Sequence, residues 1–146
     1  MLRDAALIPL SHQHHNGLAL CVLTRRSLAA DASPENVAKL ARRAIDRYEL
    51  ELANHFAIEE EVLFPLCGAM PLVAKLVGEH RSLEALVAEL RAAPSAAALE
   101  RLCELLSTHI RCEEGELFEQ IQRELPREAL ERAGREIDER AVRICL

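Results

Sequence analysis

Three long stretches of this chain carry apolar residues at alternating spacings of three and four, the pattern of helices that each bury one face. In the first stretch the stripe is Ile45, Tyr48, Leu52, His55, Glu59, Val62 and Leu66. In the next it is Val73, Leu76, His80, Leu83, Val87 and Leu90, and in the last it is Leu99, Leu102, Leu106, His109, Glu113, Leu117 and Gln120. Histidine and glutamate therefore occupy positions that a helical bundle would bury.

Proline and serine residues predict where the helices begin and end. Ser11 is a candidate cap for a first helix, Ser33 before Pro34 opens a second, and Ser95 is a candidate cap for a later one. The expected helices cover residues 11–30, 34–65, 71–94 and 95–123, followed by a shorter helix from Pro126 nearly to the C-terminus. Because the links are short, neighbouring helices should run antiparallel. The predicted fold class is all-α: an up-down-up-down four-helix bundle with an additional short C-terminal helix, as one domain over residues 1–146.

The composition of the chain argues against several classes of function. The chain has 146 residues, half of them hydrophobic, and its formal net charge of -6 argues against binding to nucleic-acid phosphates. No apolar run approaches the roughly 18 residues that a membrane span needs, and the N-terminus shows no secretion signal. Five cysteines without a C-x-x-C pair are typical of reduced thiols. We therefore predict a cytoplasmic protein that binds neither nucleic acid nor membrane; no pattern indicates its oligomeric state.

Two segments of the chain read almost alike. Each places a histidine four residues before a glutamate, His55 before Glu59 and His109 before Glu113, so that both side chains leave one helix face. One such pair is usually an exposed hydrogen-bonded pair, but two copies in core stripes, with His80 in a third, favour metal ligands. Buried ionised carboxylates are costly, and two at one level repel each other. A dimetal centre removes both problems, because carboxylates can bridge two ions that imidazoles bind terminally.

The sequence of the first expected helix fits two rotations, or phases, of the helix about its axis, and each buries a different set of residues. One buries His15, Leu18 and Val22, and the other buries His14, Leu18 and Cys21. An internal repeat aligns the segment that starts at His15 with the segment that starts at His80, and this alignment favours His15 as the core residue. His12 and His14 are then expected at the surface or beside the ligands, although either could take the place of His15.

The repeat also predicts how two metals would share the ligands. One metal would take His15 and His55, the other would take His80 and His109, and Glu59 and Glu113 would bridge them. Six such groups exceed the needs of one tetrahedral zinc, and mixed imidazole and carboxylate ligands suit iron, manganese or zinc. Each metal keeps an open position for dioxygen, peroxide or nitric oxide. Three further glutamates stay open: Glu84 as a ligand or a salt-bridge partner, and Glu60 and Glu114 as solvated residues or ligands.

Four segments carry a family resemblance: Leu10-Ser-His-Gln-His-His15, residues 55–65 from His55 to Pro65, Glu79-His80-Arg-Ser-Leu-Glu84, and His109-Ile-Arg-Cys-Glu113-Glu114. Together they resemble the hemerythrin-like, histidine-histidine-glutamate (HHE) cation-binding domains. The resemblance implies a four-helix bundle around a non-haem di-iron centre that binds dioxygen reversibly or senses it. It places the family's ligands at His15, His55, Glu59, His80 and His109.

The chain departs from the oxygen-carrying hemerythrins in two places. These carriers have a further histidine one turn after the third-helix ligand, where this chain has Glu84, and an aspartate five residues after the last histidine, where it has Glu114. Related bacterial domains use a glutamate at four residues, so Glu113 is the predicted ligand. We predict two iron ions with an oxo or hydroxo bridge, in a protein that binds or senses dioxygen rather than a dedicated enzyme. Ferrous iron oxidation, or reduction of peroxide or nitric oxide, is the alternative, which both departures favour.

Overall fold

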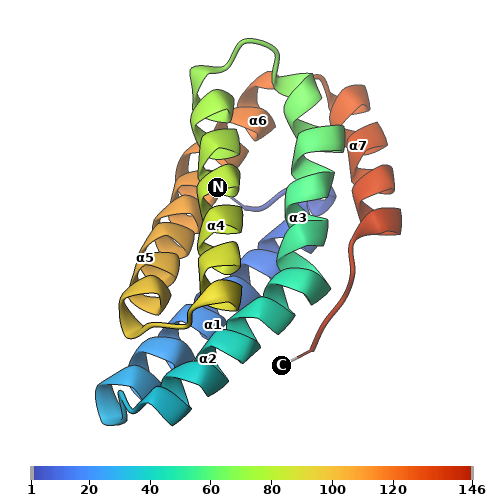
Figure 1. Cartoon of the computed structure of the whole chain (residues 1–146). Coiled ribbons are helices and arrows are strands. Elements are labelled where there is room, and N and C mark those ends of the chain that lie inside the picture. The colour runs from blue at the N-terminus through green and yellow to red at the C-terminus, as the bar shows by residue number, and fades with distance from the viewer. Residues whose placement is uncertain (1, 146) are drawn as a thin grey trace.

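Helices make up nearly all of residues 2–145, the part of the chain that this computed structural model describes (Figure 1). The α-helices are α1 (Ile8–Ala30), α2 (Pro34–Arg47), α3 (Ala53–Ile58), α4 (Pro71–Ala92), α5 (Ala96–Cys112), α6 (Phe118–Glu124) and α7 (Arg127–Arg140). A wider π-helical turn at Tyr48–Leu52 joins α2 to α3, and a second at Glu59–Leu63 continues this rod to the 3-10 turn Phe64–Cys67. A third π-helical turn at Glu113–Leu117 joins α5 to α6. Residues 2–145 contain no strand, so the all-helical prediction is confirmed.

Two of the three predicted serine caps are correct. The Ser33 hydroxyl accepts the backbone N–H of Asn36 at 3.2 Å, and the Ser95 hydroxyl accepts that of Ala98 at 3.0 Å. Such bonds satisfy donors that a helix start leaves free. These local signals therefore fix the starts of α2 and α5.

The predicted cap at Ser11 is wrong. The helix α1 begins earlier, at Ile8, behind a 3-10 turn whose first free N–H, that of Ala6, is accepted by the Asp4 carboxylate at 2.9 Å. Ser11 lies inside the helix, and its hydroxyl donates to the Glu114 carboxylate at 2.7 Å. Asp4 therefore caps the start of this helical segment, the role that was predicted for Ser11.

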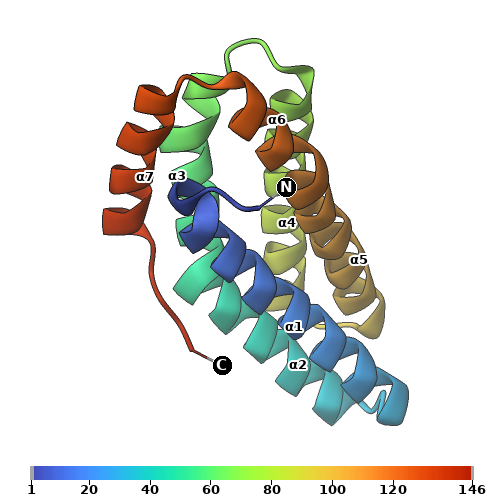
Figure 2. The same ribbon diagram turned by 180° about the vertical axis from the view of Figure 1, so that it is seen from behind.

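Four helical rods pack around a shared interior. They are α1, the continuous α2–α3 rod, α4, and the continuous α5–α6 rod. The helix α1 packs against α2 and α5, and α4 packs against the same two helices, while α7 lies outside against α3 and the N-terminal turn (Figures 1 and 2). The apolar core forms two clusters, and every rod runs from one cluster into the other. A layer of buried polar side chains lies where the clusters meet. No helix within residues 2–145 is long and apolar enough to cross a membrane.

The π-helical turns shift the buried face by one residue. The predicted stripes continue to Leu66 and Gln120, but Leu66 is exposed and Gln120 is only half-buried. Their following neighbours, Cys67 and Ile121, are buried instead. A π turn holds more residues than an α turn. After such a turn, each buried position therefore comes one residue later in the sequence than α-helical spacing predicts.

Candidate metal centre

Six charged or polar side chains form the layer between the two apolar clusters. They are His14, His55, Glu59, His80, His109 and Glu113, and each is at most 3 % exposed. Every rod contributes, since the histidines come from α1, α3, α4 and α5. Both glutamates are the first residue of a π-helical turn. Such turns often accompany functional sites in helices.

The six side chains form two sets of four that share both glutamates. His14 and His55 make one set with Glu59 and Glu113, and His80 and His109 make the other with the same two residues. Within each set the ligand atoms lie within 4.8 Å of one another. This is the arrangement expected of two metal positions bridged by two carboxylates, with His14 in the place predicted for His15.

All four imidazoles turn Nε2 toward the shared carboxylates. His14 Nε2 lies 2.9 Å from Glu113 Oε2, and His109 Nε2 lies 2.7 Å from Glu113 Oε1. The distances from Glu59 Oε1 are 3.1 Å to His55 Nε2 and 3.2 Å to His80 Nε2. The donor atoms therefore converge on one small volume at the centre of the bundle.

The prediction that His15 rather than His14 is the core residue of α1 is wrong. His15 is exposed, whereas His14, Gly17 and Cys21 are buried on one face of α1. That face lies against α5, and a β-carbon on Gly17 would sit only 2.9 Å from the Ile110 Cδ1 atom. The rotation of α1 that places Gly17 against α5 also turns His14, one turn before it, into the bundle.

A ring of outer partners binds the other nitrogen of each imidazole. His14 Nδ1 lies 2.5 Å from Glu114, His80 Nδ1 2.7 Å from Glu60 and His109 Nδ1 2.8 Å from Glu79, while His55 Nδ1 lies 2.9 Å from the Gln13 side-chain oxygen. All four partner atoms are oxygens that accept, so each Nδ1 must carry the proton. The lone pair of a neutral imidazole is then on Nε2, facing the centre, as a metal ligand requires.

Each outer partner is the sequence neighbour of a ligand, yet it supports a histidine on another rod. Gln13 beside His14 supports His55, and Glu60 beside Glu59 supports His80. Glu79 and Glu114 continue the ring to His109 and back to His14. The sequence patterns predict no role for Gln13 or Glu79, and they leave Glu60 and Glu114 open between a solvated face and a ligand role. Adjacency to a core ligand was the available signal.

The remaining candidates lie outside the two sets. Glu84 is partly exposed and pairs with Arg81 at 3.3 Å, so of its two predicted roles the structure shows the salt bridge. His12 is exposed, with Nε2 3.2 Å from the Ile144 carbonyl oxygen. Glu114 contacts Nδ1 of His14 and belongs to neither set.

The three phenylalanines of the chain pack against the imidazoles. Phe56 stacks on His80 with ring centroids 4.0 Å apart, and Phe64 lies beside the same imidazole at 5.8 Å. Phe118 stacks on His14 at 5.3 Å. These rings wall the centre with apolar surface, which excludes water and lowers the local dielectric constant.

The electrostatics of the layer are unbalanced without a cation. Burial and the neighbouring Glu113 charge raise the pKa of Glu59 well above its usual range. Burial also acts to raise the pKa of Glu113, but polar contacts from Glu59 and His109 outweigh it and hold that pKa well below its usual range. Burial acts to lower the pKa of His14, but bonds to Glu113 and Glu114 raise it to about 9. The neighbours of Glu113 thus stabilise it as an anion, whereas burial and negative neighbours disfavour the ionised form of Glu59.

Comparison with known families bears on this geometry. The family model described as the hemerythrin HHE cation binding domain matches residues 6–121. This chain belongs to that family. No curated protein and no solved structure matches the chain. The match spans all six residues of the central layer, so the predicted HHE resemblance is confirmed.

The residues present in this HHE domain fit a metal site. Several buried atoms at the centre make no hydrogen bond: Nε2 of His55, His80 and His109, both carboxylate oxygens of Glu59, and Oε1 of Glu113. Buried polar atoms without partners are rare and costly in native proteins. Nitrogen and oxygen donors facing one another with their lone pairs free are satisfied together by cations. Such a donor set, without thiolate, suits iron, manganese or zinc.

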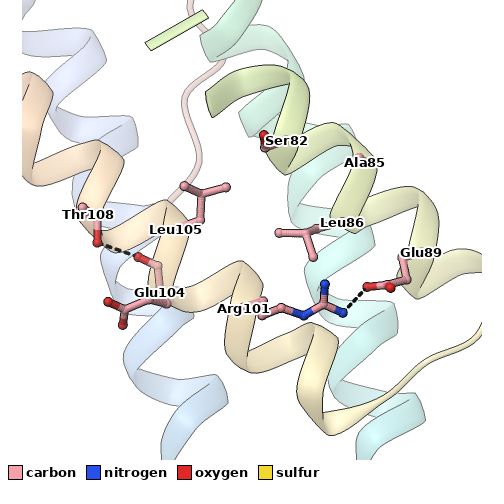
Figure 3. A pocket seen from close by; sticks show the side chains of 8 residues that line it. All are labelled: Ser82, Ala85, Leu86, Glu89, Arg101, Glu104, Leu105 and Thr108. Carbon is pink, nitrogen blue, oxygen red and sulfur yellow. Dashed lines mark hydrogen bonds and ion pairs between the residues drawn. The ribbon is translucent and has the colours of Figure 1, made fainter. Parts of the chain in front are cut away.

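A second feature of the HHE domain lies apart from the centre. A surface groove of about 590 Å³ runs between α4 and α5 (Figure 3). Leu86 and Leu105 face into it, and an ion pair of 2.7 Å between Arg101 and Glu89 crosses one end. None of the residues that line the groove belongs to the central layer or its outer ring, so we do not assign it to the metal centre.

Proposed function

We propose that this HHE domain holds two iron ions and uses them to bind or sense dioxygen or a similar small molecule. His14 and His55 would hold one ion, His80 and His109 the other, and Glu59 and Glu113 would bridge them. The observation that supports this most directly is that both four-residue sets contain the same two glutamates. Manganese or zinc would fit the same donors but would not supply reversible dioxygen chemistry of this kind.

The number of ligands supports a role in small-molecule binding. Each metal position has two imidazoles and two shared carboxylates, four protein groups in all. Octahedral iron has six positions, so some remain for an exogenous ligand. The apolar wall of Phe56, Phe64 and Phe118 would admit a small neutral molecule in preference to a charged one.

The arrangement of the rods supports the predicted order of the bundle. Short links at residues 31–33 and 93–95 join α1 to α2 and α4 to α5. We propose the up-down-up-down order, with residues 1–146 acting as one domain. In this order the four rods bring one histidine each to the same level.

The outer ring favours a second candidate function, redox turnover. Three of the four imidazoles are backed by carboxylates, which raise the basicity of the ligand and stabilise the higher oxidation state of a bound metal. A centre that favours the ferric state would pass electrons from ferrous iron to dioxygen, or, once reduced by an external electron donor, would reduce peroxide or nitric oxide rather than carry dioxygen.

Mixing the reduced, iron-loaded protein with dioxygen tests the proposal. For carriage or sensing we expect a new absorption band that persists for minutes and bleaches when dioxygen is removed under vacuum. A band that decays within seconds to a ferric spectrum would indicate turnover. If dioxygen leaves the spectrum of the iron-loaded protein unchanged, the proposed function is wrong.

A further inference from the structure

The outer ring is not uniform, and its exception is Gln13. Three imidazoles donate Nδ1–H to a carboxylate, but His55 donates to a neutral amide oxygen. Gln13 is 1 % exposed, so its amide is part of the interior. One of the two metal positions therefore has a weaker outer partner than the other.

The three carboxylates of the ring lead to surface cations. Glu114 pairs with Arg3 at 3.2 Å and Glu79 with Lys75 at 3.6 Å, and Glu60 forms an ion pair with Arg81. Each imidazole on these three sides therefore begins a chain from the centre through a carboxylate to a basic side chain. The resemblance among the three chains makes the fourth side stand out.

On the fourth side the chain leads to the C-terminal segment, residues 141–145. The Gln13 amide nitrogen donates to the Asn54 side-chain oxygen at 3.0 Å and to the Val142 carbonyl oxygen at 3.1 Å. Asn54 in turn accepts the Val142 N–H at 3.0 Å and donates to the Arg140 carbonyl oxygen at 3.0 Å. Because both partners of the Gln13 nitrogen are acceptors, this position requires a donor, which a glutamate carboxylate lacks. The tail contacts therefore account for glutamine in the ring.

A neutral acceptor polarises an imidazole less than a carboxylate does. Carboxylate partners raise the basicity of a ligating histidine and orient its ring, and their loss typically lowers metal affinity by about 10- to 100-fold. Both imidazoles of the His80–His109 position have carboxylate partners, whereas only one imidazole of the His14–His55 position does.

We propose that Gln13 is a positioning residue that presents His55 through a neutral amide held by the C-terminal segment, and that the metal at His14 and His55 therefore exchanges before the metal at His80 and His109. This inference rests on the proposed dimetal function. It assigns different behaviour to two positions that the same two glutamates bridge.

Release of iron from the full-length protein tests the inference. The protein is loaded without oxygen with two equivalents of Fe²⁺, and a chromogenic ferrous chelator then follows release. We expect two phases of equal amplitude. Gln13→Leu keeps the side-chain bulk but removes the acceptor, and should speed the fast phase by about 10-fold or more while leaving the slow phase unchanged. Gln13→Glu loses the bonds to Asn54 and Val142 but gives His55 a carboxylate partner, and should slow the fast phase toward the slow one.

Glu79→Gln is the matched control, because it makes the opposite exchange beside His109. It should speed the slow phase and leave the fast phase unchanged, and thermal melts followed by circular dichroism should show that all variants remain folded. A role in packing alone would not produce opposite effects on two separate phases. This inference is overturned if both irons leave in one phase, or if substitutions of Gln13 leave the rates of both phases unchanged. Either result leaves the dimetal proposal standing. A protein that binds fewer than two irons before the challenge overturns both.

Discussion

Glu59→Ala is expected to remove most of the bound metal and to lower the stability of the metal-loaded protein. The side chain is fully buried, and both sets of candidate metal ligands contain it. Loss of a ligand present at a hundredfold over its dissociation constant removes about 2.7 kcal/mol of stabilisation, so a loss of at least this order is expected. Metal content by elemental analysis and thermal unfolding with and without a chelator measure both effects.

The metal-free form of the same variant should behave in the opposite way. Without a cation, burial and the neighbouring Glu113 charge destabilise the ionised Glu59 carboxylate. Removing this carboxylate should leave the metal-free protein as stable as the unsubstituted one, or more so. Glu61→Ala is the control, since Glu61 lies two residues further on and is exposed. Equal metal content in Glu59→Ala and Glu61→Ala would contradict the bridging role.

His14→Ala and His15→Ala should differ sharply, although the residues are adjacent. His14 is buried in the centre and His15 is exposed. We expect His14→Ala to empty one metal position and to weaken binding by more than the roughly 10- to 100-fold that loss of an outer partner costs. His15→Ala should retain both metals.

Titration of the two metal-free variants with Fe²⁺ under anaerobic conditions measures this difference. The expected stoichiometries are one ion per chain for His14→Ala and two for His15→Ala. Loss of a metal in His15→Ala with full binding in His14→Ala would mean that α1 is rotated by one residue from the position described.

Much of the fold followed from local sequence signals. The Ser33-Pro34 and Ser95 caps act within three or four residues, so the chain shows them directly. Both His-x-x-x-Glu pairs were also placed correctly in the core, because one helical turn fixes their geometry whatever the surroundings. The division of His55 and His80 between the two four-residue sets followed from the repeat.

The rotation of α1 could not be obtained in this way. Leu18 fits both phases of the helix, and the choice between His14 and His15 depends on how α1 approaches and packs against α5, as it does near Gly17. That approach is a tertiary contact with Ile110, a residue far along the chain. The repeat alignment matched residue types and carried no information about this contact.

The outer ring and the π-helical turns were missed for a related reason. The partners Gln13, Glu60, Glu79 and Glu114 are polar residues next to core ligands, and a stripe analysis assigns such residues to the solvated face. They are drawn to the centre because each meets a histidine from a neighbouring rod. The π turns at Glu59 and Glu113 shift later positions by one residue, which a fixed helical period cannot express.

Elemental analysis of the protein purified from its native host tests the central claim most directly. We predict two iron atoms per chain, because two sets of buried imidazoles face the same pair of carboxylates. One zinc atom per chain, or protein that is fully folded and carries no metal, would contradict it.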